Sequence, residues 1–441
     1  MPDSSGCRGR ESHLILQRTS RKEVEKGITV VTRGEGVQVY DQDGRAYLDL
    51  TAGVTRPVHV GYGRRELAQA AYDQMCRLSY FTPMNFSNPP AENLAETLAE
   101  LIPGPIDKFL FICDGSEAVD SAVKLAQHYH HFRGDKKRYK VITRRGAYHG
   151  VTGLALRSLG TVLPMRHIME PVAPGGVFVE SPYCYRCPYH LEYPACDLHC
   201  ARDVARIIEF EDPEQVSAFL AEPIQQGFGA LAPVREYWPI IREICDRYGV
   251  LLIIDEVICG FGRTGRWFGH QHFDLRPDLI TMAKGLTSGY IPLGAVGCID
   301  EIMAPIDTFH HLHTYGNHPV SCAVALKNLE IIRAEKLVEK SARMGEYFLA
   351  GLRSLAHHPL VGQVRGTGLW TAMDLTSDKK TRAPVHPSRL TNLIERAKSK
   401  GLIIKTMGWA LEFAPPLIIT ESDIDLAVKI LDQCLTEEEE T

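Results

Sequence analysis

The chain has 441 residues, of which 44% are hydrophobic and 23% are charged, and its formal net charge is -5. This composition excludes a disordered or fibrous protein, and the length suits one large and one small domain. The lack of a basic surplus argues against a nucleic-acid partner. No apolar run is long enough to span a membrane, and the N-terminus lacks the apolar core of a signal peptide, so we expect a cytoplasmic protein.

In the first part of the chain, residues 28–50 alternate between apolar and polar side chains around an Asp43-Gly44 turn, which predicts a β-hairpin. Strand-like and helical patterns then alternate. The helical patterns lie at 64–78, 90–102, 116–133 and 234–249, and the strand patterns at 107–113, 139–144, 216–224, 250–257 and 277–282. Because the strands are almost continuously apolar, this alternation predicts a mostly parallel sheet covered by helices on both faces.

One insertion, residues 184–200, holds two close pairs of cysteines, Cys184 with Cys187 and Cys196 with Cys200. Two such pairs could ligate zinc. The alternative is a structured insertion rich in proline and tyrosine. We expect most of the 12 cysteines of this chain to be reduced thiols.

The last part of the chain has a different character. A long helical pattern covers 317–356, and strand patterns follow at 360–375 and 410–420. These segments predict a smaller α/β domain that the N-terminal hairpin joins. We therefore divide the chain into an N-terminal segment, a large domain and a C-terminal small domain, with bounds at 1–60, 61–325 and 326–441.

Two charged residues stand at the carboxyl ends of predicted strands, where open α/β sheets bind ligands. Asp255 follows five apolar positions, and a carboxylate there needs a cationic partner or strong hydrogen bonds. For the adjacent Glu256, a salt bridge to Arg263 is an alternative use of the charge. Lys284 ends another strand, where a charged lysine is costly unless it is used or reaches solvent.

Two further strand ends carry residues that suit a phosphorylated aromatic cofactor. Gly115 and Ser116 open a helix whose N-terminus could bind phosphate, although an ordinary helix cap is the alternative. Tyr148 and His149 lie between glycines, so that an aromatic ring could stack on a planar ligand, unless the segment is only a turn. Together with the lysine and the aspartate, this set predicts a site for pyridoxal 5'-phosphate.

Six motifs, in order, resemble those of one enzyme family. They are GSEAVDSAVKLA, AYHG, LAEPIQ, DEVICGFGRTG, MAKGLTSGYIPLGA and HTYGNHPVSCAVAL. The chain resembles the class III pyridoxal-phosphate aminotransferases of the ω-amino acid:pyruvate or taurine:pyruvate type over residues 28–430. The resemblance implies fold type I, with a mostly parallel sheet in the large domain and a smaller α/β domain built from both termini.

The resemblance also implies a role for each matching residue. Lys284 would form the Schiff base, Asp255 would bind the pyridine nitrogen, and Tyr148 would stack on the ring. The other expected cofactor-binding residues are Gly115 and Ser116 at the phosphate, Val257 behind the ring, and His149, Glu222 and Thr314 around it. Because Thr314 is expected to reach the phosphate of a neighbouring subunit, the resemblance implies a homodimer with its active site at the interface.

Two positions depart from the family pattern and bear on the substrate. Lys405 stands where many relatives have an arginine for the substrate carboxylate, and lysine is a point charge rather than a bidentate fork. Arg56 stands where relatives often have a tryptophan, which suggests a substrate with an anionic group. Alternatively, Arg56 turns to solvent or pairs with an acid.

The expected reaction moves an amino group from a small ω-amino compound bearing a sulfonate, phosphonate or carboxylate to a keto acid such as pyruvate. Two alternatives stay open. The first is a lyase of the same fold that eliminates ammonia or phosphate from a small amino alcohol phosphate or phosphonate. The second is a silent scaffold, which the pair of Lys284 and Asp255 disfavours.

Overall fold

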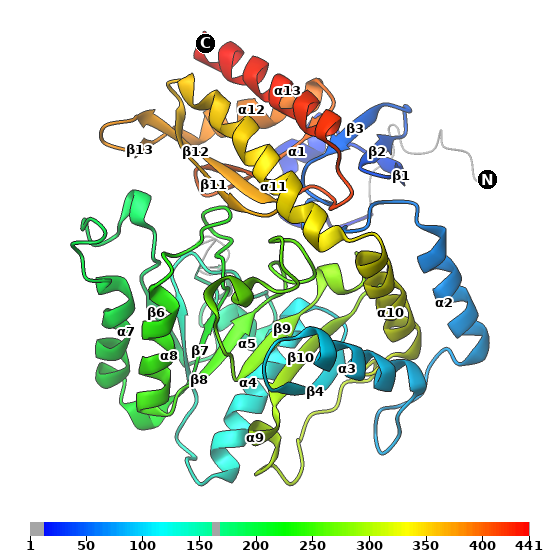
Figure 1. The fold of residues 1–441 in the computed structure, drawn as a ribbon, viewed down its shortest axis with the longest axis vertical. Helices are drawn as coiled ribbons and strands as arrows, with labels where there is room; N and C mark the ends of the chain where they lie inside the picture. Colours follow the sequence, from blue (N-terminus) through cyan, green and yellow to red (C-terminus); the bar gives the residue numbers. More distant parts are fainter. Residues whose placement is uncertain (1–12, 161–167, 441) are drawn as a thin grey trace.

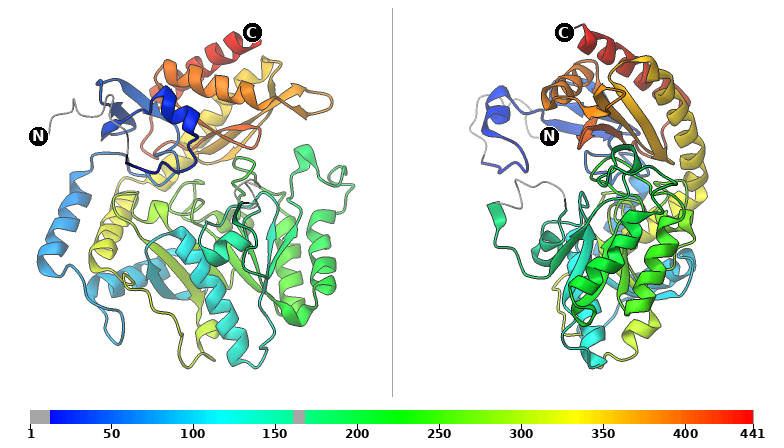
Figure 2. Two further views of the ribbon diagram at one scale, coloured as in Figure 1. Left: turned by 180° about the vertical axis from the view of Figure 1, so that it is seen from behind. Right: turned by 90° about the vertical axis from the view of Figure 1, so that its left-hand side faces the viewer.

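The computed structural model describes residues 13–160 and 168–440. The molecule has two parts (Figure 1). The larger part is built on a seven-stranded sheet, and the smaller part contains a four-stranded and a five-stranded sheet. The first and last described segments both belong to the smaller part, as the views from behind and from the side also show (Figure 2).

The seven-stranded sheet is parallel except for one strand. Its order is β4 (Ile106–Ile112), β10 (Gly294–Ile299), β9 (Leu279–Met282), β8 (Leu251–Asp255), β7 (Val216–Ala221), β5 (Lys140–Arg144) and β6 (Gly176–Val179). Only β10 runs antiparallel to its two neighbours, β4 and β9. The other six strands therefore end at the same edge, which confirms the mostly parallel sheet that the sequence predicts.

Helices cover both faces of this sheet, and its central strands are largely apolar. Every residue of β7, β8 and β9 is buried. The helices of the larger part are α2 (Arg65–Arg77), α3 (Pro89–Leu101), α4 (Gly115–Phe132), α5 (Gly153–Arg157), α7 (His199–Phe210), α8 (Tyr237–Tyr248), α9 (Asp300–Met303) and α10 (Pro319–Ala334). Helix α4 packs on β9, β10 and β7, and it begins directly after β4 ends at Ile112, so its N-terminus lies at the edge where the parallel strands end.

The smaller part joins the two ends of the chain. Strands β1 (Val31–Glu35), β2 (Gln38–Asp41) and β3 (Ala46–Asp49) form an antiparallel meander, and β14 (Leu402–Ile403) pairs with β3 in parallel. The other sheet contains β11 (Val361–Thr367), β12 (Trp370–Asp378), β13 (Ala383–Pro384), β15 (Lys405–Met407) and β16 (Ala410–Phe413). The helices of this part are α1 (Arg21–Lys26), α11 (Leu337–Ser354), α12 (Pro387–Ser399) and α13 (Glu421–Glu439).

The hairpin predicted for 28–50 is present, with Asp43-Gly44 between β2 and β3. The long helical pattern at 317–356 is instead two helices, α10 and α11. They separate because Lys336 has a left-handed backbone, with φ +50°, which a continuous helix does not allow. The domain bound placed between residues 325 and 326 lies inside α10, and the exact bounds stay a prediction.

The insertion at 184–200 is folded. The ring of Tyr189 packs edge-on against His199, with 4.6 Å between the ring centroids. All eleven cysteines of the described ranges are free thiols. Among the described residues, two sets of histidine, cysteine, aspartate or glutamate bring at least three possible metal-ligating atoms within 4.8 Å of one another. Neither set includes the four cysteines of the insertion, so the zinc hypothesis for them stays a prediction.

In the described part of the chain, no helix is long and apolar enough to cross a membrane.

Candidate active site

A cavity of about 360 Å³ opens where the parallel strands of the large sheet end. It lies beside the first turn of α4 and the loop that follows β5. Eight of the predicted site residues line it: Gly115, Ser116, Tyr148, His149, Glu222, Asp255, Val257 and Lys284. The structure thus brings together residues from five segments of the sequence, as the sheet topology requires.

Lys284 follows β9 and begins a short 3-10 turn, Lys284–Leu286, with its own backbone at φ +45°. The side chain of Asn328 holds this turn by donating to the carbonyls of Gly285 and Leu286, at 2.8 and 3.0 Å. Burial and, to a lesser extent, the charge of Arg56 lower the pKa of Lys284 to about 8, whereas Asp255 opposes the shift. A lysine with this pKa is readily neutral, which a nucleophilic amine needs.

Asp255 ends β8, and three donors fix its carboxylate. His149 Nδ1 lies 2.7 Å from Oδ2. On Oδ1, the backbone N–H of Val257 donates at 3.0 Å and the hydroxyl of Thr281 at 3.1 Å. These three donors fix the orientation of a buried carboxylate at the cavity wall. The sequence analysis missed Thr281, although it precedes the lysine by only three positions.

Glu222 and His149 hold the loop that carries Tyr148. Glu222 Oε1 accepts the backbone N–H of Tyr148 at 3.1 Å, and Oε2 lies 3.4 Å from Arg144 Nη2. His149 Nε2 lies 3.1 Å from the hydroxyl of Thr143. Arg144 is fully buried and supplies the charge that lets Glu222 stay buried. It was not predicted, because an arginine within a strand gives no local signal of such a role.

The N-terminus of α4 forms another wall of the cavity. Asp114 caps the helix by accepting the N–H of Glu117 at 2.9 Å. The amides of Gly115 and Ser116 have no acceptor within the helix, as in any first turn, and can bind an anion. A Cβ atom on Gly115 would lie 2.9 Å from Val257 Cγ1, so only glycine allows the valine to pack this close.

The residues of this cavity fit pyridoxal phosphate. Lys284 offers an amine, and the carboxylate of Asp255 offers a partner for a protonated ring nitrogen. The start of α4 offers donors and a positive helix end for a phosphate. Tyr148 lines the same cavity and offers an aromatic face, and burial raises the pKa of its hydroxyl, so the ring stays neutral.

Arg56 does not line this cavity. Its guanidinium is buried and forms a two-pronged ion pair with the carboxylate of Glu412, with Nε 3.1 Å from Oε1. The indole N–H of Trp370 donates to the same carboxylate at 2.6 Å. The sequence left three partners open for Arg56, an anionic substrate, solvent or an acidic residue. The structure pairs it with an acidic residue, Glu412. Glu412 was not predicted, because it lies 356 positions away in the sequence.

Lys405 also lies close to Glu412, opposite it in the pairing of β15 with β16. Its ammonium donates to the carbonyl of Val54 at 2.9 Å. Burial lowers the pKa of Lys405 to about 7, and Arg56 contributes to this shift, whereas Glu412 opposes it. The ion-pair partner of Glu412 is Arg56, and Arg56, Lys284 and Arg18 give the environment of Lys405 an excess of positive charge.

The salt bridge between Glu256 and Arg263 that the sequence offered as an alternative is wrong, because each residue has other partners. The carboxylate of Glu256 accepts from the backbone N–H groups of Gly269 and His270 and lies 2.8 Å from His270 Nδ1. Arg263 instead donates to the carbonyls of Leu369 and Pro415.

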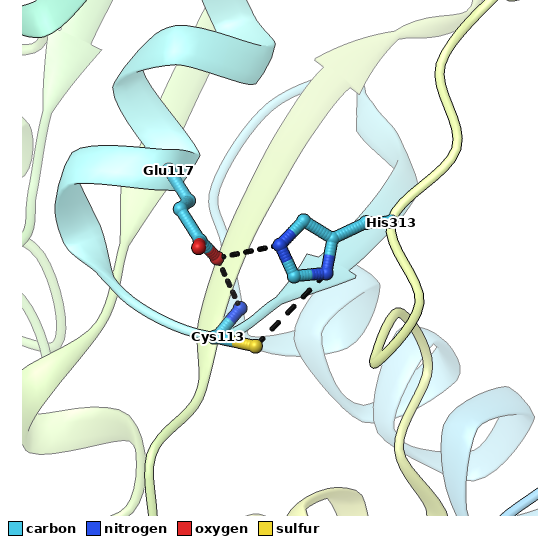
Figure 3. Close-up of side chains that lie close together, drawn as sticks. All are labelled: Cys113, Glu117 and His313. Carbon is cyan, nitrogen blue, oxygen red and sulfur yellow. Dashed lines mark hydrogen bonds and ion pairs between the residues drawn. The ribbon is translucent and has the colours of Figure 1, made fainter. Parts of the chain in front are cut away.

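Thr314 is exposed and does not line the cavity of its own chain. The hydroxyl of Tyr80 donates to its carbonyl at 2.9 Å. Beside it, His313 approaches the cavity wall near Cys113 (Figure 3). His313 Nε2 lies 2.9 Å from Glu117 Oε2, and His313 Nδ1 lies 4.0 Å from Cys113 Sγ. Burial and the charge of Glu117 raise the pKa of the Cys113 thiol to about 11, so it stays protonated.

Comparisons with known proteins find similar sequences and structures over almost the whole chain. The sequence model described as aminotransferase class-III matches residues 19–435. The putrescine–pyruvate aminotransferase of Pseudomonas aeruginosa is 39% identical, covering 97% of this chain and 94% of the relative. The taurine–pyruvate aminotransferase of Bilophila wadsworthia is 36% identical, covering 95% and 94%. The solved ω-transaminase of Pseudomonas jessenii in complex with PMP is 35% identical over 97% of each chain, with a TM-score of 0.93.

Proposed function

Because the chain belongs to the class III aminotransferases, which use pyridoxal phosphate, we propose the reaction that this enzyme carries out. It moves an amino group from a small ω-amino compound with an anionic group at its far end to a keto acid such as pyruvate. The observation that carries the transfer is the half-buried Lys284 with its lowered pKa, in one cavity with the fixed carboxylate of Asp255. Pyruvate is the acceptor named for both relatives.

Several residues in and behind the cavity wall have a definite task in this reaction. Bound pyridoxal phosphate supplies a carbonyl that condenses with amines and a ring that accepts electrons. The neutral Nζ of Lys284 removes a proton from the substrate carbon that bears the amine. The same atom then donates this proton to a carbon of the cofactor. Asp255 stabilises a protonated ring nitrogen, and His149 and Thr281 keep its carboxylate in place. The amides at the start of α4 hold the phosphate.

The excess of positive charge around Lys405 supports the proposal that the substrate carries an anionic group. A lysine whose pKa is lowered by burial and by a neighbouring guanidinium gains stability when an anion arrives, because the anion favours its charged form. Lys405 does not line the cavity itself, but the charge of Lys284 is among those that lower its pKa, so we assign the contact with the anion to Lys405. Arg56 is a positioning residue, since it occupies Glu412 and so leaves Lys405 less neutralised.

The amine can be identified with the holoenzyme alone. Taurine, β-alanine, putrescine and propylamine are each mixed with the holoenzyme without keto acid, and the cofactor spectrum and free ammonia are measured. We expect stoichiometric conversion of the cofactor to pyridoxamine phosphate, fastest with taurine or β-alanine. Continuous release of ammonia would instead indicate the lyase. If putrescine or propylamine reacts fastest, the anionic group is wrong, although the aminotransferase remains.

The role of Lys405 is tested by Lys405→Met. A charge-assisted hydrogen bond is worth about 1.5–3 kcal/mol, so the variant should bind anionic amines about ten- to a hundredfold more weakly. Propylamine should be affected little, and Lys405→Arg should restore part of the loss. Lys400→Met is the matched control, because Lys400 lies in the same part of the molecule and pairs with Glu437 at its surface. An equal loss on propylamine would give Lys405 a purely structural role.

The homodimer also belongs to this proposal. Thr314 lies next to exposed apolar side chains that a second copy of the chain would cover: Tyr80, Phe81, Met84, Phe86, Leu312 and Tyr315. An aspartate at both Phe86 and Leu312 should convert the dimer to a monomer in analytical ultracentrifugation. Because Thr314 would then no longer reach a neighbouring phosphate, the monomer should also bind pyridoxal phosphate more weakly. A dimer that is unchanged would contradict this interface.

We further place the enzyme in the cytoplasm. The free thiols of the eleven described cysteines fit a reducing compartment. Fractionation of cells that produce the protein would test this placement.

A further inference from the structure

A cluster of two histidines and one aspartate lies in the smaller part, between the 3-10 turn Leu355–His357 and helix α13. His357 and His358 are consecutive, and Asp432 lies on α13. His358 Nε2 is 3.0 Å from Asp432 Oδ1, and His357 Nε2 is 3.7 Å from the same oxygen. This is one of the two sets of described residues whose possible ligand atoms converge within 4.8 Å.

The outer contacts of the two rings determine where their protons lie. His357 Nδ1 is 2.9 Å from the carbonyl of Ser354, which can only accept a hydrogen bond. His358 Nδ1 is 3.2 Å from both oxygens of Glu439. Each Nδ1 therefore carries a proton, and in a neutral ring the Nε2 then carries a lone pair. In neutral rings two lone pairs then face one carboxylate oxygen, which is repulsive unless each ring gains a second proton or a metal cation lies between the three atoms.

We propose that His357 Nε2, His358 Nε2 and Asp432 Oδ1 bind a divalent transition-metal ion of the zinc type. Two imidazoles and a carboxylate are ordinary ligands of such an ion, and water can complete a tetrahedron. The contacts of the Nδ1 atoms are those that orient metal-binding histidines, a carbonyl in one case and a carboxylate in the other. The ion links the turn before β11 to the C-terminal helix.

The ion can reach this position from solvent. The side chain of His357 is 64% exposed and that of Asp432 is 47% exposed, whereas that of His358 is 5% exposed. One ligand is therefore held rigidly and two are accessible. The site is separate from the cofactor cavity, none of whose lining residues belongs to it, so its test is independent of the aminotransferase proposal.

The proposal is tested by metal stoichiometry. Holoenzyme is treated with a chelator, dialysed and titrated with zinc sulfate at neutral pH, and bound zinc is counted by mass spectrometry. His357→Asn and Asp432→Asn should each bind one zinc fewer per chain than the wild type, and should lose the rise in unfolding temperature that zinc causes. His386→Asn is the matched control, since His386 is exposed at the cap of α12 in the same part. Its stoichiometry should equal that of the wild type.

A milder variant separates metal binding from folding. Glu439→Gln keeps all three ligands but weakens the orientation of His358, so zinc affinity should fall about ten- to a hundredfold with unchanged stoichiometry. The proposal is overturned if His357→Asn binds as much zinc as the wild type. The second described set, Cys113, Glu117 and His313, could also bind zinc, so the variant His313→Asn is measured as well. If this variant binds no zinc at all, the second set accounts for all the zinc that the wild type binds, and the proposal is overturned. In either case protonated His357 and His358 contact Asp432 directly, without a metal ion.

Discussion

The pKa of Lys284 makes cofactor loading dependent on pH. Burial and Arg56 lower this pKa from the usual range near 10.5 to about 8, so the neutral amine forms well below the pH at which a free lysine loses its proton. Only the neutral amine attacks a carbonyl. In cofactor-free protein, the rate at which pyridoxal phosphate becomes covalently bound should therefore rise with pH, with a midpoint near 8.

Stopped-flow absorbance between pH 6 and 10 measures this rate. A midpoint near 10 would mean that Lys284 is solvated rather than buried. Lys284→Ala is the blank, because without the amine the absorption band of the lysine-bound cofactor should be absent and turnover should be lost.

Asp255 should contribute more to catalysis than any one of the residues that hold it. Asp255→Asn removes the negative charge and should lower kcat at least about a hundredfold, the range typical of groups that control proton transfer. Thr281→Val removes one of three hydrogen bonds to a carboxylate that remains, so its loss should stay within about tenfold. Steady-state kinetics of both variants with the same amine measures the difference. Equal losses would mean that orientation, not charge, is what Asp255 supplies.

Lys405 should make the binding of anionic substrates dependent on pH in the opposite direction. Its pKa is lowered to about 7, so the ammonium that attracts an anion is lost as the pH rises through that value. The KM for β-alanine should therefore increase above pH 7, up to about tenfold per pH unit. The KM for propylamine should lack this increase. Parallel pH profiles for the two amines would exclude Lys405 from anion binding.

At the scale of the elements, the start of α4 depends on the absence of one side chain. Gly115→Ala would place a Cβ atom 2.9 Å from Val257 Cγ1, so the helix start must shift away from the phosphate it is expected to hold. The dissociation constant of pyridoxal phosphate should rise at least severalfold, and a second change, Val257→Ala, should recover part of the loss. Gly153→Ala is the matched control, because Gly153 also opens a helix and its added Cβ would meet nothing within 4 Å.

The elements also show which parts of the site the sequence could predict. The cavity residues follow strands or open a helix, so strand periodicity and topology bring them to one edge without knowledge of any side-chain contact. Arg144, Thr281 and Glu412 were missed because their roles lie in contacts made by buried strand side chains, which no local pattern reports. The break at Lys336 was missed because the residues around it continue a helical pattern, and a single left-handed residue interrupts it.

At the scale of the whole molecule, the ion pair of Arg56 and Glu412 connects the two ends of the chain. Arg56 lies in the segment after β3, and Glu412 lies on β16, in the C-terminal sheet. Both side chains are almost fully buried, and Trp370 donates to the same carboxylate. A pair of this kind fixes how the N-terminal segment sits against the small domain, since moving either partner would expose a charge to an apolar environment.

Arg56→Ala should therefore act mainly on stability. It leaves Glu412 buried without its cation, which costs about 3–5 kcal/mol of unfolding free energy. Replacing both partners by methionine removes the unpaired charge and should recover most of that loss, because a buried ion pair and apolar side chains of similar volume are often equivalent. Denaturant unfolding of the holoenzyme measures both, with Arg33→Ala, which breaks an exposed pair with Glu35, as a control that should change little. If the double variant is as unstable as Arg56→Ala, the arginine stabilises the protein through packing and not through its charge.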